Sequence, residues 1–378
     1  MRGSSPAVPA PALRRFLLLV LVALSVLAAV DSADAGTLRT DLGKALVPLE
    51  EVIAGGPPPD GIPPIDKPVF VSPAAADAWL KPAEPVLGFR IGSDARAYPL
   101  QILIWHEIVN DVVGGRPVVV TFCPLCNAGL VFDRVVSGTR LDFGTSGKLW
   151  KSDLLMYDRE THSLWSQMEG RAVVGARAGA RLTPLPANTL AYEDFKQAYP
   201  GGRVLSRETG ASRVYGRNPY EGYDEAESRP FLFQEAPDPR RPPKERVVGV
   251  TVGGVARAYP WPILARRGVA HDDWGGEKLV VFYRPGALSA LDQSQIDASR
   301  AVGATAVYSR VVDNRALTFE PVPAGFRDAE TGSVWNLLGR AVSGPLAGRE
   351  LRPLPHVDAF WFAWAAFHPA TTIHGVQP

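Results

Sequence analysis

Two cysteines are the residues whose type and spacing point most directly to chemistry. Cys123 and Cys126 are the only cysteines of the chain, and they follow the apolar run 118–122 with two residues between them. Such a pair can share one metal ion, cycle between dithiol and disulfide, or stabilise a turn. Each use requires different neighbours, so the rest of the chain must be used to choose among them.

A metal centre is the first interpretation, and it requires further ligands. His106 lies in an apolar stretch before the cysteines, and one imidazole with two thiolates suits zinc or copper better than magnesium or calcium. Met156 would favour copper at the fourth position, whereas Glu107, His162 or water would favour zinc there. The ligand set that we predict for this copper or zinc ion comprises His106, Cys123, Cys126 and Met156.

Catalysis at such a centre would need a proton carrier, and Glu107 and Asp158 are the candidates. The same residue types also have ordinary structural uses. A histidine in an apolar helix is often a hydrogen-bonded core residue, methionine commonly packs in the core, and His162 falls in a predicted turn. The polar pairs Asp133–Arg134 and Ser152–Asp153 suit a site or a turn equally well.

Two other classes of function remain open. A thiol–disulfide exchange protein would use Cys123 and Cys126 as its redox pair, but such a motif normally opens a helix, and residues 127–133 read as a turn followed by a strand. A non-catalytic binding or scaffold protein would use its C-terminal part to recognise a small molecule or a protein partner. Cys123→Ser would be silent if the cysteines were incidental to function.

Composition and charge exclude one broad class of function. The 378 residues are 46% hydrophobic and 21% charged, with a net charge of +1. The basic residues are scattered along the chain instead of forming the cluster that nucleic-acid binding requires. We therefore expect a globular protein that does not bind nucleic acid.

The N-terminus has the pattern of a signal peptide. Arg14 and Arg15 precede the apolar run 16–30, which ends at the small-residue motif Ala33–Ala35. We expect cleavage after Ala35 and a periplasmic or secreted protein, with an uncleaved anchor as the alternative. No second apolar run is long enough to span a membrane. Residues 36–85 form a proline- and glycine-rich segment that we expect to pack on the first domain.

The remaining sequence repeats itself. Ala95-Arg-Ala-Tyr-Pro99 recurs 161 residues later as Ala256-Arg-Ala-Tyr-Pro260, and Asp158-Arg-Glu-Thr is answered by Asp328-Ala-Glu-Thr. The pattern predicts a duplicated α+β fold with mainly antiparallel sheet and short helices in two related halves. The predicted domains are residues 86–220, which carry the cysteines, and residues 246–378, joined by a linker over 221–245.

Chemical differences between the two copies indicate one functional centre. At the 161-residue offset, His106, Cys123 and Cys126 are replaced by arginine, arginine and alanine. The later motif places phenylalanine opposite Met156 and glycine opposite His162. The site is therefore predicted only in the first repeat.

Three stretches together resemble the bacterial and archaeal family known as domain of unknown function 3179. They are GGPPPDGIPPIDKPVF (55–70), ARAYPLQILIWHEIVNDVVGGRPVVVTFCPLCNAGLVFDR (95–134) and SDLLMYDRETHSLWSQ (152–167). The C-terminal stretch beginning GSVWNLLGRAV resembles the end of the longer members, so the likeness spans nearly the whole mature chain. His162 departs from the glycine or other turn residue expected there. The resemblance implies the same focus on His106, Cys123 and Cys126, and it implies no particular reaction.

Overall fold

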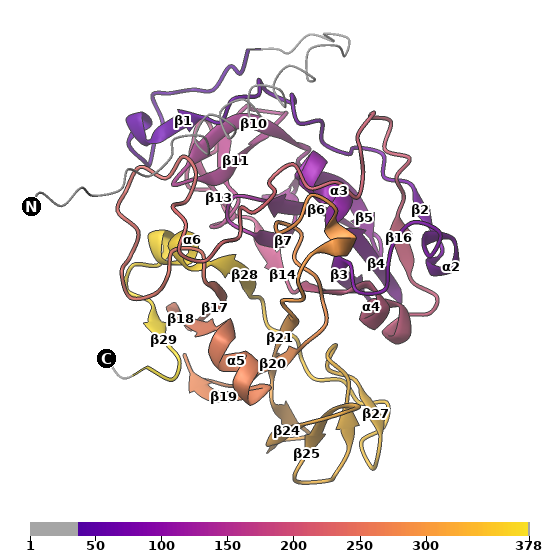
Figure 1. Cartoon of the computed structure of the whole chain (residues 1–378). Helices are drawn as coiled ribbons and strands as arrows, with labels where there is room; N and C mark the ends of the chain where they lie inside the picture. Colours follow the sequence, from indigo (N-terminus) through magenta and orange to yellow (C-terminus); the bar gives the residue numbers. More distant parts are fainter. Residues whose placement is uncertain (1–36, 377–378) are drawn as a thin grey trace, which may run out of the picture. The chain divides into compact units, whose positions relative to one another are not determined.

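Among the residues that the structure describes, the protein is mostly β-sheet, with 41% of them in strands and 11% in helices. The structure, a computed structural model, describes residues 37–376 (Figure 1). The expected signal peptide therefore lies outside the described residues. Most strand pairs are antiparallel, and the helices are short, as the sequence predicts.

Three larger sheets form the N-terminal half. In spatial order the first contains β1 (Val52–Ala54), β10 (Phe143–Trp150), β11 (Asp153–Asp158), β12 (Leu164–Ser166) and β13 (Arg171–Val174). The second contains β14 (Thr183–Leu185), β7 (Ala128–Asp133), β6 (Arg116–Cys123) and β5 (Ile108–Val113). The third contains β15 (Asn188–Ala191), β3 (Pro85–Ile91), β4 (Asp94–Pro99), β16 (Arg203–Leu205) and β2 (Phe70–Val71).

The C-terminal half also contains three larger sheets. The first is ordered β28 (Val357–Phe360), β17 (Arg246–Val252), β18 (Val255–Pro260) and β29 (Thr372–Ile373). The second is β19 (Val269–Trp274), β20 (Glu277–Arg284) and β21 (Ala304–Ser309). The third is β24 (Phe319–Val322), β25 (Gly325–Asp328), β26 (Val334–Trp335) and β27 (Ala341–Ser343). Two small ribbons pair β8 (Val135–Val136) with β9 (Thr139–Arg140) and β22 (Val311–Val312) with β23 (Arg315–Ala316).

Short helices connect these sheets. They are η1 (Leu49–Glu51), α2 (Pro73–Ala76), α3 (Leu100–His106), α4 (Tyr192–Ala198), α5 (Trp261–Arg267), η2 (Ile296–Ala298) and α6 (Trp361–Phe367). Helices α3 and α5 begin directly after Pro99 and Pro260, where the fixed φ of proline suits a helix start. Among the described residues, none of the helices has the length and hydrophobicity needed to cross a membrane.

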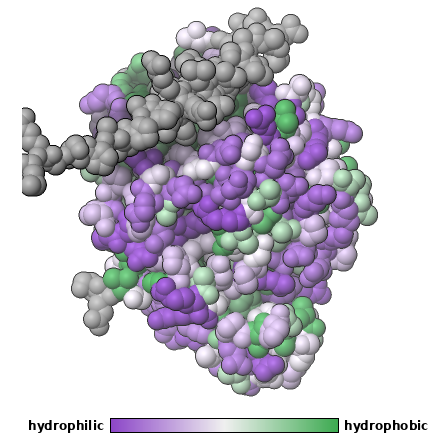
Figure 2. Space-filling view, in the orientation of Figure 1, coloured by the Kyte–Doolittle hydropathy of each residue, from purple (hydrophilic) through white to green (hydrophobic). Residues whose placement is uncertain are grey.

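One hydrophobic core contains residues of both halves. Phe122 and Trp165 from the N-terminal half belong to the same buried cluster as Phe360 and Trp364 from the C-terminal half. The segment 221–245 contains no helix or strand, yet its Phe233 is buried and packs on Phe362 with ring centroids 5.1 Å apart. Figure 2 shows a mainly hydrophilic face with small separate apolar patches. The apolar residues of the two halves named above pack in this shared core.

The described part of the proline-rich segment, residues 37–85, also contacts the sheets. Ile65 is buried, and its backbone exchanges hydrogen bonds with Ile108 and Asn110. Strand β1 pairs with β10, and β2 pairs with β16. These contacts supply partners for backbone groups that a free segment would leave to water.

Two buried aspartates stabilise corresponding turns in the two halves. Asp158 accepts hydrogen bonds from the backbone N–H of Thr161 at 2.6 Å and from Trp165 Nε1 at 2.8 Å. Asp328 accepts the corresponding bonds from the backbone N–H of Thr331 at 2.6 Å and from Trp335 Nε1 at 2.8 Å. Each carboxylate satisfies a turn N–H and a buried indole N–H, so both have a structural role.

Asp158→Asn and Asp328→Asn are each expected to lower the free energy of unfolding by about 2 kcal/mol. An amide nitrogen cannot accept a hydrogen bond, so one of the buried donors would lose its partner. Denaturant unfolding followed by tryptophan fluorescence would measure the loss. The control is Asp313→Asn, because Asp313 has a side chain that is 60% exposed. Unchanged stability of either buried variant would contradict this assignment.

Candidate functional site

The turn between β6 and β7 positions both cysteines. Strand β6 ends at Cys123, and Asn127 closes the turn by donating its N–H to the Pro124 carbonyl at 3.2 Å. Asn127 has φ +52, a left-handed conformation that asparagine tolerates better than most residues. Strand β7 starts at the next residue, as the sequence predicts, and both thiols are buried, with Cys123 2% and Cys126 0% exposed.

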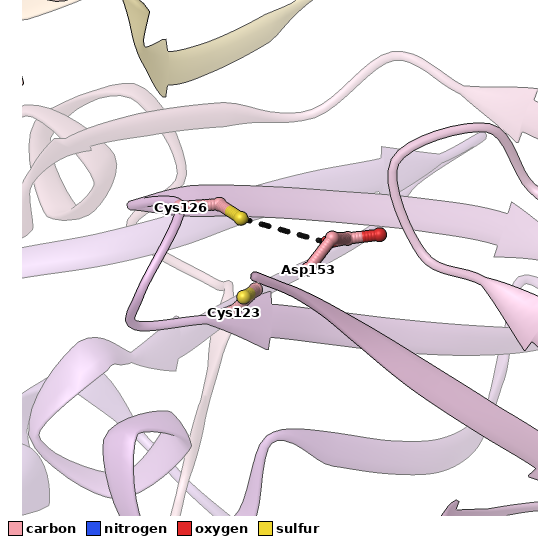
Figure 3. Close-up of side chains that lie close together, drawn as sticks. All are labelled: Cys123, Cys126 and Asp153. Atoms are coloured by element: carbon pink, nitrogen blue, oxygen red, sulfur yellow. Dashed lines mark hydrogen bonds between the residues drawn. The ribbon is translucent and has the colours of Figure 1, made fainter. Parts of the chain in front are cut away.

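The turn between β10 and β11 brings a third acidic group to the thiols. Lys151 and Ser152 form this turn with φ +55 and +64, and Asp153 begins β11. The sulfur atoms of Cys123 and Cys126 and one carboxylate oxygen of Asp153 all lie within 4.8 Å of one another (Figure 3). Cys123, Cys126 and Asp153 are hereafter called the thiol–carboxylate cluster.

The hydrogen bonds of Asp153 fix its orientation. Oδ2 accepts from the backbone N–H of Met168 at 2.9 Å and from the Ser166 hydroxyl at 3.3 Å. Oδ1 accepts a weak hydrogen bond from the Cys126 thiol at 3.7 Å. The Cys126 thiol also lies 3.5 Å from the carbonyl oxygen of Ser152. The cluster is therefore held by the backbone of two hairpins.

A second buried carboxyl group lies near this cluster. Glu107 follows α3 and is 8% exposed, and its backbone carbonyl accepts the N–H of Phe122 at 2.8 Å. Its φ of +58 is unfavourable for a side chain with a Cβ, and the matching residue after α5 is Gly268, with φ +72. A strained, buried glutamate in place of a matching glycine indicates a role other than ending the helix.

Burial perturbs the acidity of these groups. It raises the pKa of Asp153 to about 7, and it raises the pKa of the Cys126 thiol well above its usual value. Burial also raises the pKa of Glu107 to about 8, with a further contribution from the charge of Asp153. Within residues 37–376, no lysine, arginine or histidine forms an ion pair with Asp153 or Glu107. The site thus concentrates acidic groups without a protein cation.

His106 does not join the cysteines in this structure. Its Nδ1 lies 2.6 Å from the Pro63 carbonyl oxygen and its Nε2 lies 2.7 Å from the Tyr215 hydroxyl. Burial lowers the pKa of His106 to about 4, so the ring is neutral, with one nitrogen donating and the other accepting. With both nitrogens engaged, His106 behaves as a hydrogen-bonded core residue and is absent from the thiol–carboxylate cluster.

The other expected ligands also lie elsewhere. Met156 is three residues after Asp153 on β11, so the alternation of a strand directs their side chains to opposite faces. His162 lies in a turn with φ +56, and its Nδ1 accepts the N–H of Arg39 at 3.1 Å. The carboxylate of Asp158, a proposed proton carrier, accepts hydrogen bonds from Thr161 and Trp165 in the turn described above.

Sequence reasoning named Ser152–Asp153 as a polar pair that suits a site or a turn, but it did not select Asp153 as a ligand, although a usable signal exists. The match between Met156 and Phe326 places Asp153 opposite Pro323, and the 161-residue offset places Glu107 opposite Gly268. Neither carboxyl group has an acidic counterpart at these positions of the C-terminal half, where the cysteines are also replaced. Extending the comparison of the repeated motifs to every acidic residue would have selected Asp153 beside Glu107, which was already a candidate ligand and proton carrier.

Segments distant in sequence cover the cysteine turn. The Phe360 N–H, from β28, donates to the Cys126 carbonyl at 2.9 Å, and the Tyr223 hydroxyl donates to the Leu125 carbonyl at 3.2 Å. Figure 1 shows β28 beside the N-terminal half. The C-terminal half and the segment 221–245 thus contribute to the burial of the site.

Comparisons with known proteins give a family but no activity. No curated protein matched the chain, and no solved structure matched it. One family model, described as a protein of unknown function (DUF3179), matches residues 59–371. This range contains every residue of the thiol–carboxylate cluster as well as Glu107. The chain therefore belongs to the DUF3179 family of proteins of unknown function.

Proposed function

We propose that Cys123, Cys126 and Asp153 bind a single zinc ion. The observation that carries this proposal is the grouping of two thiols and a carboxylate within 4.8 Å, all fully or almost fully buried. Buried acidic groups without a cation are costly in their charged forms, and a metal ion would compensate them. Thiolate sulfur and carboxylate oxygen are both common zinc ligands.

Zinc suits this donor set better than copper. Copper would be favoured by a thioether or by additional imidazole nitrogen. The alternation of strand β11 argues that Met156 and Asp153 are on opposite faces, and the ring nitrogens of His106 are hydrogen-bonded to Pro63 and Tyr215. A carboxylate as the third group therefore supports zinc as the ion of this site.

Glu107 is the residue that we assign to the open side of the site. Three protein ligands leave one position of a tetrahedral zinc ion for a carboxylate or a water molecule. Glu107 is buried and close enough to Asp153 for the two charges to interact. With Asp158 committed to a turn, Glu107 is the better candidate for carrying a proton at this site.

We also propose that the two halves arose by duplication and that only the first retained the site. Strands β3 and β4, helix α3 and strands β5 and β6 recur as β17, β18, α5, β19 and β20, each shifted by 161 residues. The export signal proposed for residues 1–35 rests on the sequence alone. It would place the zinc site in the periplasm or outside the cell.

A redox function is the second candidate because the two sulfur atoms lie close together. Two features oppose it. Strand β7, not a helix, follows the CxxC turn, so no helix N-terminus lowers the thiol pKa. Both thiols are also shielded from an exchange partner, since neither cysteine is more than 2% exposed.

Elemental analysis with a thiol count on the mature protein, purified without chelators, tests the proposal. We expect about one zinc ion per chain in the wild type and less than about a tenth of that in Asp153→Asn and Cys126→Ser. Asp158→Asn is the matched control, because it changes a buried aspartate on the same strand and should keep the zinc. Absence of both metal and free thiol in the wild type would overturn the proposal in favour of a disulfide.

A further inference from the structure

The C-terminal half contains an open pocket of about 250 Å³ that is separate from the thiol–carboxylate cluster. It lies between helix α5, the end of β20 and residues 224–246. Its lining includes Asp224, Lys244, Arg246, Trp261, Tyr283 and Arg300. None of these residues contributes to the proposed zinc site, so the two features can be considered independently.

Lys244 is the unusual residue of this pocket. Its side chain is buried, with the residue only 3% exposed, and its ammonium group donates to the Tyr223 carbonyl and lies 3.7 Å from the Tyr223 ring centroid. In the described part of the chain no carboxylate forms an ion pair with it; Asp224 and Glu225 act on it only from longer range. Burial lowers the pKa of Lys244 to about 8. A buried ammonium without a carboxylate partner favours binding of an anion.

The other charges of the pocket are already paired. Asp224 lies 2.9 Å from Arg246 Nη2 and 2.9 Å from Arg300 Nη2. Glu245, which also lines the pocket, forms a bidentate ion pair with Arg241. The carboxylates of the lining are therefore held by arginines, and among the described residues no carboxylate forms an ion pair with Lys244.

One wall of the pocket is aromatic. The rings of Trp261 and Tyr283 line it and lie 5.9 Å apart at 81° in an edge-to-face arrangement. At the 161-residue offset, Lys244, Arg246 and Trp261 correspond to alanine, proline and leucine in the N-terminal half, and Tyr283 corresponds to phenylalanine. The cationic and aromatic lining thus occurs only in the C-terminal half.

We propose that this pocket binds a small carboxylate with a planar apolar body, whose carboxylate pairs with Lys244 and whose body packs on Trp261 and Tyr283. An anion alone would pair with the ammonium group but make no contact with the aromatic wall. An uncharged ring would contact the wall and leave the ammonium group without an anionic partner. A ligand with both features satisfies the whole lining.

The test measures binding of benzoate, benzamide and phosphate to the full mature chain by isothermal titration calorimetry. Benzoate is expected to bind at least about tenfold more tightly than either other probe, because only benzoate combines a charge-assisted contact with ring packing. Equal binding of benzoate and benzamide, tighter binding of phosphate, or no binding of benzoate would each overturn the proposal.

Two variants locate the binding. Lys244→Met keeps an unbranched side chain one atom shorter and removes its charge, and it should abolish the preference for benzoate over benzamide. Lys278→Met, at a side chain that is 51% exposed, is the control. Ala265→Phe fills the pocket from an exposed position on α5 and should abolish benzoate binding, with Val255→Phe as its control. Because Ala265 is exposed, this variant should remain folded even if Lys244→Met does not. Unchanged benzoate binding in Ala265→Phe would overturn the proposal.

Discussion

The metal-free protein is expected to lose roughly 3 kcal/mol of stability as the pH rises from about 5 to about 8. The groups responsible are Asp153 and Glu107, whose pKa values burial raises to about 7 and about 8. Carboxyl groups of an unfolded chain titrate near about pH 4. Between these values the folded protein binds more protons than the unfolded chain.

The sign follows from this difference in bound protons. Unfolding at intermediate pH releases protons, so raising the pH favours unfolding. The stability that the protonated carboxyl groups contribute is fully present below about pH 4 and is lost as the pH passes through about 7 and 8. Each unit of pKa shift corresponds to about 1.4 kcal/mol, and the expected loss is set below the full sum because water entry and local relaxation reduce the penalty.

Denaturant unfolding of chelator-treated protein across this pH range would measure the loss. Asp153→Asn removes one carboxyl group together with its effect on the pKa of Glu107, and its stability should fall by about 2 kcal/mol less than that of the wild type over the same range. Taking the difference cancels titrating groups that do not interact with Asp153, such as the buried Asp358, whose pKa burial raises to about 7. Identical pH profiles of the wild type and Asp153→Asn would contradict the assignment.

Added zinc should reverse this trend. Zinc binds the deprotonated forms of the cysteines and Asp153, so its affinity rises with pH. The stability gained on adding zinc should therefore be greater at pH 8 than at pH 5 by at least about 2 kcal/mol. The proposed site would be wrong if zinc stabilised the wild type and Asp153→Asn equally.

Glu107→Gly is expected to stabilise the metal-free protein by about 2 kcal/mol at pH 8. Glycine removes the left-handed strain at φ +58, which costs about 1 kcal/mol, and it also removes a buried carboxyl group with a raised pKa. The greater flexibility of glycine in the unfolded chain offsets part of this gain. At pH 5 the carboxyl group is protonated, so the stabilisation should fall to about 1 kcal/mol or less.

The same substitution should weaken zinc binding by about tenfold, since groups beside metal ligands commonly tune affinity by this factor. Gly268→Ala is the matched control at the end of α5. It should destabilise, because glycine there has φ +72 and a Cβ would lie 2.8 Å from Pro321. A loss of stability in metal-free Glu107→Gly at pH 8 would show that Glu107 has a structural role. The expected result for Glu107→Gly, higher stability together with weaker zinc binding, is typical of substitutions at functional sites.

Much of the local structure could be predicted from the sequence. Helices α3 and α5 begin directly after Pro99 and Pro260, and the residues after Cys126 form a turn and then a strand. His162 occupies a left-handed turn position, matching Gly332 in the other half. These features depend on the φ preferences of proline and glycine and on hydrophobic alternation, which act between residues close in the chain.

Which residues form the thiol–carboxylate cluster depended on contacts between segments distant in sequence, and no short sequence pattern predicts such contacts. The sequence by itself determined the mostly antiparallel sheets, the short helices and the position of Cys123 and Cys126 at the two sides of one turn. Only the tertiary structure decided that Asp153 from a different sheet meets these cysteines, while His106 turns toward Pro63 and Tyr215. Side-chain direction follows from strand register and helix phase, but which faces come together is set by the packing of sheets whose strands are distant in sequence.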